Sequence, residues 1–285
     1  MLLVLFAVSV LTFLIFNVLP GGDPALRMAG RQPDPGQLKR IREDWGFDKP
    51  VYVQYVKTME QVVTGDLRSY ATQQNVWGEL KGRIPRTFAL SIGAAILWML
   101  VATVLGLYTA MKAGKFSDRF LTIIALVGIS MPVFWIGALV NYYLGFKWKL
   151  VPNGGYVPFA DDPYQWFAHL IMPWTVLSIL FIGVYSRILR SNVLDTMSDD
   201  YVRTARAKGL SERQVLVKHV LRNSLIPIVT LWGLDFGAVL GGGAILTETV
   251  FELQGVGQYA AESIGQLDQP PVLFITMFGA SSSCC

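Results

Sequence analysis

Charged side chains are scarce in this chain. Of its 285 residues only 15% are Asp, Glu, Lys or Arg, whereas 53% are hydrophobic. Soluble domains carry about a quarter charged residues, so this composition disfavours a purely soluble protein. Disorder is excluded as well, because it requires low hydrophobicity and high charge. The formal net charge is only +4, so we expect no nucleic-acid partner.

Cysteine and histidine are almost absent, and a nucleotide-binding loop is missing. Cys284 and Cys285 are adjacent at the end of the chain and have neither metal-ligand spacing nor a disulfide pattern. His169 and His219 stand apart, so no metal site is expected. A phosphate loop requires Gly-x4-Gly-Lys-Ser/Thr, and the nearest string, Gly114-Lys115-Phe116, lacks the first glycine and the hydroxyl. No nucleophile, histidine and acid stand at a readable spacing, so we expect a non-catalytic chain without a cofactor.

Long apolar stretches dominate what is present. A helix needs about 20 apolar residues to cross a bilayer. The predicted spans are residues 1–22, 87–111, 120–146, 170–187 and 224–247, with an incomplete sixth at 272–280. The first stretch lacks the basic lead and cleavage site of a signal peptide, which favours a retained span over that alternative. That missing lead and the atypical tail 281–285 predict that both ends of the chain are shortened.

Basic residues in the short loops set the predicted orientation. Lysine and arginine gather at 112–119 and 187–222, and neither occurs from 223 onward. Cytoplasmic loops carry this excess, so these two loops are placed inside, and 147–169 and 248–270 outside. The N-terminus is then cytoplasmic and 23–86 is extracytoplasmic. That segment is itself basic, but long loops obey the charge rule poorly.

The segment 23–86 has the signals of a small helical subdomain. Asp34-Pro35-Gly36-Gln37 predicts a helix start and Gly46 its end. Pro50 opens a second amphipathic stretch that Gly65 closes. A structural lid and a ligand site both fit this pattern.

The loop 191–222 predicts a helix, a glycine turn and a second helix. Two acids precede a basic end in Asp199–Lys208, Gly209 stands where a left-handed C-cap would, and Ser211-Glu212-Arg213-Gln214 is a capping box. Tyr201, Ala205 and Lys208 are spaced by four and three, so they share a helix face. This loop fits either an interfacial helix on anionic lipid or a docking element.

The fifth predicted span carries a glycine stripe and a single acid. Gly233, Gly237 and Gly241 recur every four residues, a pattern that lets helices approach closely in lipid. Asp235 lies on the opposite side of this helix, so it should face the bundle interior or a watery path. It either lines that path or ties two spans together. A secondary transporter or channel is the alternative function, although no internal repeat supports it.

Several strings together resemble one family. Arg203-Thr204-Ala205, Gly209 and Leu225-Ile226-Pro227 resemble the "EAA" loop in the membrane-spanning permeases of binding-protein-dependent ABC importers, of the dipeptide/oligopeptide type. Arg203 replaces the glutamate of the general loop, as is common in the peptide branch. Further matches are Leu19–Pro24, Gly65-Asp66-Leu67, Pro85-Arg86-Thr87 and Thr247–Phe251. The resemblance covers residues 5–280.

This resemblance implies an all-α, six-span ABC importer permease bundle in a bacterial or archaeal cytoplasmic membrane, with a small extracytoplasmic helical subdomain. It implies as partners a second homologous permease, two ABC ATPase subunits that hold ATP and Mg, and an extracytoplasmic substrate-binding protein. Family substrates include di- and oligopeptides, nickel complexes, glutathione and glycosides. The implied ATPase-coupling residues are Tyr201, Arg203, Thr204, Ala205, Lys208, Gly209, Ser211 and Pro227.

Overall fold

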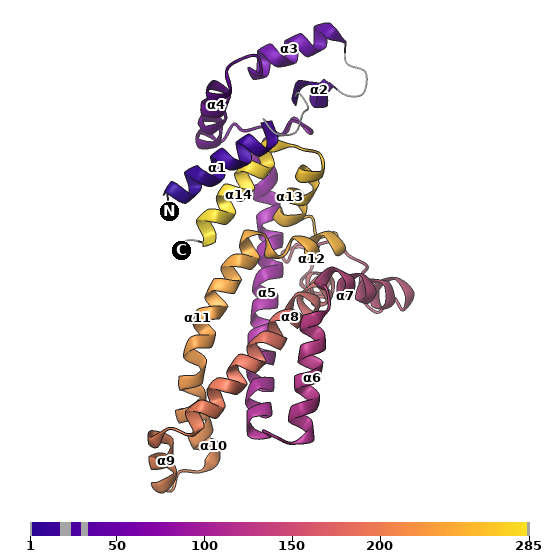
Figure 1. Ribbon diagram of the computed structural model, residues 1–285. Helices are drawn as coiled ribbons and strands as arrows, with labels where there is room; N and C mark the ends of the chain where they lie inside the picture. The colour runs from indigo at the N-terminus through magenta and orange to yellow at the C-terminus, as the bar shows by residue number, and fades with distance from the viewer. Residues whose placement is uncertain (1, 18–23, 30–33, 284–285) are drawn as a thin grey trace. The chain divides into compact units, whose positions relative to one another are not determined.

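A computed structural model describes residues 2–17, 24–29 and 34–283 (Figure 1). Within these ranges the elements are helices, and the only strand-like feature is a bridge between Arg68 and Asn75. The predicted string Leu19–Pro24 falls mostly outside the described residues, as do Cys284 and Cys285. The helices before the first long span are α1 (Leu2–Asn17), α2 (Pro24–Ala29), α3 (Pro35–Trp45) and α4 (Val51–Thr64).

Among the described residues, three helices are long and apolar enough to cross a membrane. They are α5 (Val76–Met111), α8 (Pro163–Met197) and a continuous helix Glu212–Gly243. This last helix comprises α10 (Glu212–Gln214), the π-helical segment η2 (Val215–Leu221), α11 (Arg222–Ala238) and the π-helical segment η3 (Val239–Gly243). The predicted span 87–111 lies within α5, which begins earlier because the Asn75 side chain accepts a hydrogen bond from the Gly78 N–H at 2.9 Å and starts the helix.

The predicted span 120–146 is not one straight helix. It is divided into α6 (Phe116–Ser130), α7 (Val133–Val140) and the π-helical segment η1 (Asn141–Lys147), and the axis bends by 99° at the break. Pro132 causes the break, because proline disfavours helical backbone in the residue before it. Met131 accordingly has an extended backbone, with φ −90° and ψ 134°.

The predicted fifth span, 224–247, is displaced at both ends. Its helix starts at Glu212 and runs through Pro227 without a break. It ends before residue 247 because Gly242 has φ +140°, a conformation open to glycine but not to other residues. The short helix α12 (Ile245–Val250) follows, then α13 (Val256–Gly265) and α14 (Gln269–Ser283).

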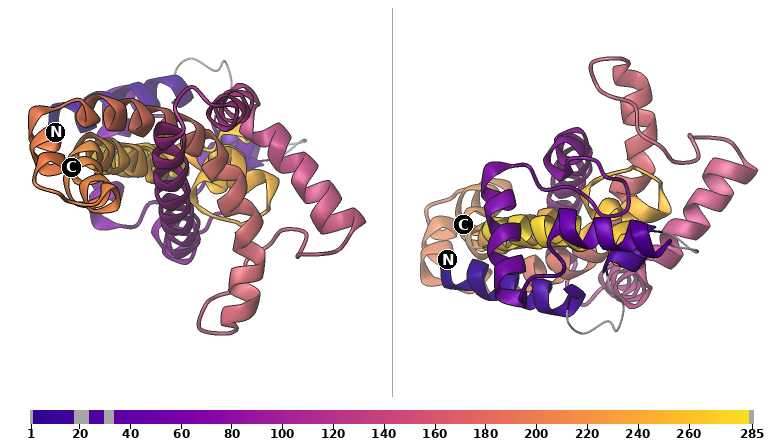
Figure 2. Two further views of the ribbon diagram at one scale, coloured as in Figure 1. Left: turned by 90° about the horizontal axis from the view of Figure 1, so that it is seen from below. Right: turned by 90° about the horizontal axis from the view of Figure 1, so that it is seen from above.

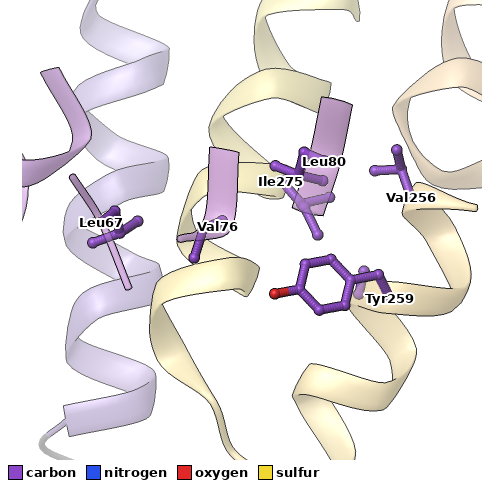
Figure 3. Packing of buried hydrophobic residues seen from close by; sticks show 7 residues of the cluster. Leu67, Val76, Leu80, Val256, Tyr259 and Ile275 are labelled. Atoms are coloured by element: carbon purple, nitrogen blue, oxygen red, sulfur yellow. The ribbon is translucent and has the colours of Figure 1, made fainter. Parts of the chain in front are cut away.

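The chain forms two compact units. Unit 1 contains residues 1–88, 240–249 and 253–285, and unit 2 contains 89–239 and 250–252. In unit 1, α1 lies along α14 (Figures 1 and 2), and Thr12 and Thr276 approach within 3.4 Å. Figure 3 shows the apolar cluster of this unit, which joins the start of α5 to α13 and α14. Its buried members are Leu67, Val76, Leu80, Val256, Tyr259, Ala260 and Ile275.

Unit 2 is assembled around the later part of α5. Three side chains donate hydrogen bonds to carbonyls of this helix: Trp174 Nε1 to Ala89 at 3.0 Å, Ser178 Oγ to Ala94 at 3.1 Å and Trp232 Nε1 to Ala95 at 3.0 Å. These bonds tie both α8 and α11 to α5. Buried tryptophans usually satisfy their N–H in this way.

Candidate functional site

The loop between α8 and α11 has the predicted helix–glycine–helix form. Helix α9 (Asp200–Ala207) is followed by Gly209 at φ +80°, in the left-handed region that glycine adopts readily. The predicted capping box is also present, since Ser211 accepts from the Gln214 N–H and the Gln214 side chain accepts from the Ser211 N–H at 3.2 Å. Both predictions about local structure are therefore confirmed.

One face of α9 is buried inside the chain. Val202 is 0% exposed and Ala205 only 5%, and α9 packs on η2. The prediction that Ala205 shares a free face with Tyr201 and Lys208 is therefore wrong. The physical reason is that Val202 and Ala205, three residues apart, form the apolar pair that covers η2. The exposed side chains on or next to α9 include those of Tyr201, Arg203, Thr204 and Lys208.

Polar contacts fix this loop to the helices on either side. Asn223 Nδ2 of α11 donates to Tyr201 Oη at 2.7 Å. Ser224 of the same helix, 2% exposed, donates to Thr196 of α8 at 3.2 Å. Arg206 and Glu212 also form an ion pair at 3.0 Å, but such exposed pairs contribute about 0–1 kcal/mol. The packing and capping therefore hold the loop, which is a stiff extension of α8 and α11.

The remaining predicted coupling residue and the predicted path residue lie in α11. Pro227 is exposed on this helix. Asp235 is half-buried, and its carboxylate accepts a hydrogen bond from Tyr185 Oη of α8 at 2.6 Å. This contact is the one expected of an acid that ties two spans together.

The predicted glycine stripe does not act as one contact surface within the described chain. A Cβ at Gly233 would meet no atom within 4 Å, and Gly237 is half-buried. Gly241 does make a close approach, because a Cβ at Gly279 of α14 would lie 2.7 Å from its carbonyl oxygen. Gly241 therefore meets α14 within the described chain, and the packing stripe as a whole stays a prediction.

A buried acid in unit 1 was not predicted as a site residue. Glu248 is 0% exposed and accepts from Thr87 Oγ1 at 2.6 Å and from the Gln258 N–H at 2.9 Å. Thr87 Oγ1 in turn accepts from the Val256 N–H at 2.9 Å. Burial raises the pKa of Glu248 above its ordinary value, against the opposing effect of these hydrogen bonds. A Cβ at Gly255 would collide with the carboxylate.

This contact joins two of the strings that suggested the family. Thr87 ends Pro85-Arg86-Thr87, and Glu248 lies in Thr247–Phe251. The signal in the sequence was an acid followed by two glycines, Gly255 and Gly257, whose missing side chains leave room for it.

A second buried acid, Asp268, holds the turn after α4. It is 3% exposed and accepts from the Ser69 hydroxyl and from the Tyr70 N–H, the latter at 2.8 Å. Tyr70 Oη also donates to Gln269 Oε1 at 3.0 Å. Burial raises the pKa of Asp268 above its ordinary value. The string Gly65-Asp66-Leu67 thus leads into a turn that is tied to the start of α14.

Metal-binding geometry does not occur in the described part of the chain. There, no three His, Cys, Asp or Glu side chains gather as a metal ion would require. His169 instead lies with Nδ1 2.7 Å from the Gln165 carbonyl oxygen, one turn earlier in α8.

The long apolar helices, with a basic loop between two of them, are typical of a polytopic membrane protein. The sequence matches the family described as "Binding-protein-dependent transport system inner membrane component" over residues 102–284. It also matches the N-terminal component of such membrane proteins over residues 1–91. The chain belongs to this family.

Individual relatives agree with that membership. The chain is 35% identical to a protein of Brucella abortus (strain 2308) whose name assigns it to the permeases of peptide transport systems, over 96% of this chain and 87% of the relative. It is 34% identical to the di/tripeptide transport system permease protein DppB of Pseudomonas aeruginosa (strain UCBPP-PA14), over 94% and 85%. It is 35% identical to the dipeptide transport system permease protein DppB of Escherichia coli (strain K12), over 93% and 85%.

The resemblance to ABC importer permeases is therefore confirmed. The chain is an all-α, multi-pass inner-membrane protein and the permease subunit of an ABC importer. It is a non-catalytic transport component, which works with ATPase and substrate-binding partners.

Proposed function

We propose that this permease translocates di- or oligopeptides delivered by an extracytoplasmic substrate-binding protein. It does so paired with a second homologous permease and driven by two ABC ATPase subunits, which hold ATP and Mg. The peptide assignment is supported by the names of relatives about 35% identical to it. The assignment of ATP coupling is supported most by the form of the loop 199–222.

The loop is suited to transmit a mechanical movement. The side chains of Tyr201, Arg203, Thr204 and Lys208 are exposed on its surface, where an ATPase would contact them. Its inner face is buried, Tyr201 is bonded to Asn223 of α11, and α11 is bonded to α8 through Ser224 and Thr196. A stiff element of this kind turns closure of the ATPases into rigid-body motion of the spans, which alternates access to a central path.

A cross-linking experiment tests the docking. Thr204→Cys is exposed and should cross-link to an ATPase subunit in the assembled complex, whereas Val202→Cys is buried and should not. Both variants require a background in which Cys284 and Cys285 are replaced. The absence of any cross-link from Thr204→Cys and Lys208→Cys, in a complex that still hydrolyses ATP, would refute docking at this loop.

The proposed topology has six membrane segments, which retain 1–22 and 272–280, and places 23–86 outside. The basic loops determine which side of the membrane each segment is expected to face. Asp161 and Lys115 are both exposed, so cysteines at these positions report the two sides. An impermeant thiol reagent should label position 161 from outside and position 115 only after permeabilisation. The reverse pattern would move the ATPases to the opposite loops.

A further inference from the structure

Helices α6 and α8 pack together within unit 2 (Figure 1). Two contacts along their length join them. At the first, a Cβ at Gly183 would lie 2.7 Å from Ile129 Cγ1 and 2.9 Å from the Ala125 carbonyl oxygen, so the two helices touch. At the second, Arg190 forms two hydrogen bonds of 2.8 Å with Asp118. Between α6 and α8, the side chains around these two contacts line an open groove.

The groove has a volume of about 1010 Å³ and is lined by apolar side chains in one part and charged side chains in another. One part is apolar, with Ile123, Ile129, Val184 and Ile188. The other part carries Arg119 and Arg187 in addition to the Asp118–Arg190 pair. Both Arg119 and Arg187 are exposed, and neither forms an ion pair within the described residues. Since Asp118 is already bonded to Arg190, the groove has two unmatched positive charges.

We propose that this groove binds an anionic phospholipid of the surrounding membrane. Its phosphate would lie between Arg119 and Arg187, and an acyl chain would lie along Ile123, Ile129 and Val184. Arginine binds phosphate through a planar fork of N–H donors. Basic pockets between membrane helices at the membrane surface are typical sites for anionic head groups.

The position of the arginines fits a lipid better than the other occupants. Arg119 directly precedes the predicted span 120–146, and Arg187 ends the predicted span 170–187. Both therefore lie at head-group level, with Ile123, Ile129 and Val184 at the level of the acyl chains. Free phosphate would leave this apolar part uncovered. A second permease would need acidic side chains here to match the two arginines.

Native mass spectrometry of the complete, delipidated importer tests the site. Titrated phosphatidylglycerol should bind, and phosphatidylcholine should bind much more weakly. Arg119→Gln/Arg187→Gln should weaken phosphatidylglycerol binding about tenfold or more, because charge-assisted hydrogen bonds are lost. Arg40→Gln/Arg68→Gln removes the same charge from exposed positions outside the groove and should leave binding unchanged. Equal weakening in both double variants would show general charge attraction and overturn the proposal.

Two further measurements separate the sources of the phosphate. Val184→Trp fills the apolar part but keeps both arginines, so it should weaken binding of the lipid. Glycerol 1-phosphate should compete poorly with the lipid in the wild-type complex, and this result decides the matter even if the double arginine variant fails to assemble. Equal competition would make the groove a site for free anions. A cross-link from Ile123→Cys to the second permease would make it a subunit interface. Either outcome would overturn the proposal.

Discussion

The hydroxyl of Tyr185 donates a hydrogen bond of 2.6 Å to the carboxylate of Asp235. Tyr185 is only 1% exposed, and its ring lies near Phe181 and Trp98. The bond therefore links α8 to α11 beside an aromatic cluster, in an environment where a polar group without a partner is costly.

Removing the Tyr185 hydroxyl should lower the stability of the protein more than removing the charge of Asp235. Tyr185→Phe leaves the Asp235 carboxylate without this partner, so the free energy of unfolding should fall by about 1–3 kcal/mol. Asp235→Asn keeps an acceptor for Tyr185 and should cost less. The exposed Tyr142→Phe is the control. Thermal unfolding of the purified permease measures the difference.

Transport by the assembled importer then separates the two roles of Asp235. If the acid only ties the spans together, Asp235→Asn should transport peptides at the wild-type rate. A stable Asp235→Asn complex that cannot transport would instead show that the charge acts in the path.

The Thr87–Glu248 contact should be a main stabilising feature of unit 1. Thr87→Val keeps the shape but removes one of the hydrogen bonds to Glu248, which keeps the bond from the Gln258 N–H, and leaves the Val256 N–H without its partner. We expect a loss of about 2–4 kcal/mol in the free energy of unfolding, since the unsatisfied N–H costs about 1–3 kcal/mol and the lost hydrogen bond about 0.5–1.5 kcal/mol. Thr87→Ser retains the hydroxyl and should lose far less. Thr249→Val is the control, because that exposed hydroxyl bonds only to the Ile245 carbonyl of its own helix. Equal losses for Thr87→Val and Thr249→Val would contradict this account.

Asp268 should make stability depend on pH. Burial raises its pKa in the folded state, so the folded protein holds the proton more tightly than the unfolded chain does. The stabilisation from Asp268 is therefore greatest in acid. It is lost as the pH rises from the ordinary aspartate pKa, which holds in the unfolded chain, through the raised pKa of the folded state. Asp268→Asn should flatten this part of the pH profile, whereas the exposed Asp66→Asn should not. Denaturation midpoints measured from about pH 4 to about pH 7 test the sign, and a profile unchanged by Asp268→Asn would refute it.

Local signals in the sequence were sufficient for local structure. The ends of α3 and α4 at Gly46 and Gly65 follow from backbone conformations that glycine adopts most readily. The Ser211 capping box is likewise encoded within four residues. In each case the interacting groups are near one another in the chain, so spacing alone determines the result.

Contacts between distant residues were not predictable from spacing. Thr87 and Glu248 are 161 residues apart, and each string matched the family without indicating that the two meet. Helical periodicity placed Asp235 away from its neighbouring glycines but gave no partner among the tyrosines. Ala205 was misplaced for a similar reason, because the helical spacing defines a face but not which face η2 covers.

In the proposed mechanism, ATP hydrolysis by partner subunits drives uptake through the loop around Gly209. Gly209 has φ +80°, and a Cβ at this residue would meet no atom within 4 Å, so a substitution there acts through the backbone alone. Valine should strain this turn by at least about 1–2 kcal/mol, whereas asparagine tolerates it.

The most direct measurement is uptake of a labelled dipeptide by proteoliposomes that contain the complete importer, with the binding protein outside and ATP inside. Uptake should require both ATP and the binding protein. It should fall strongly in Gly209→Val, with loss of substrate-stimulated ATP hydrolysis, and persist in Gly209→Asn. Uptake driven by an ion gradient without the ATPase subunits, or full ATP-coupled transport by Gly209→Val, would contradict the account.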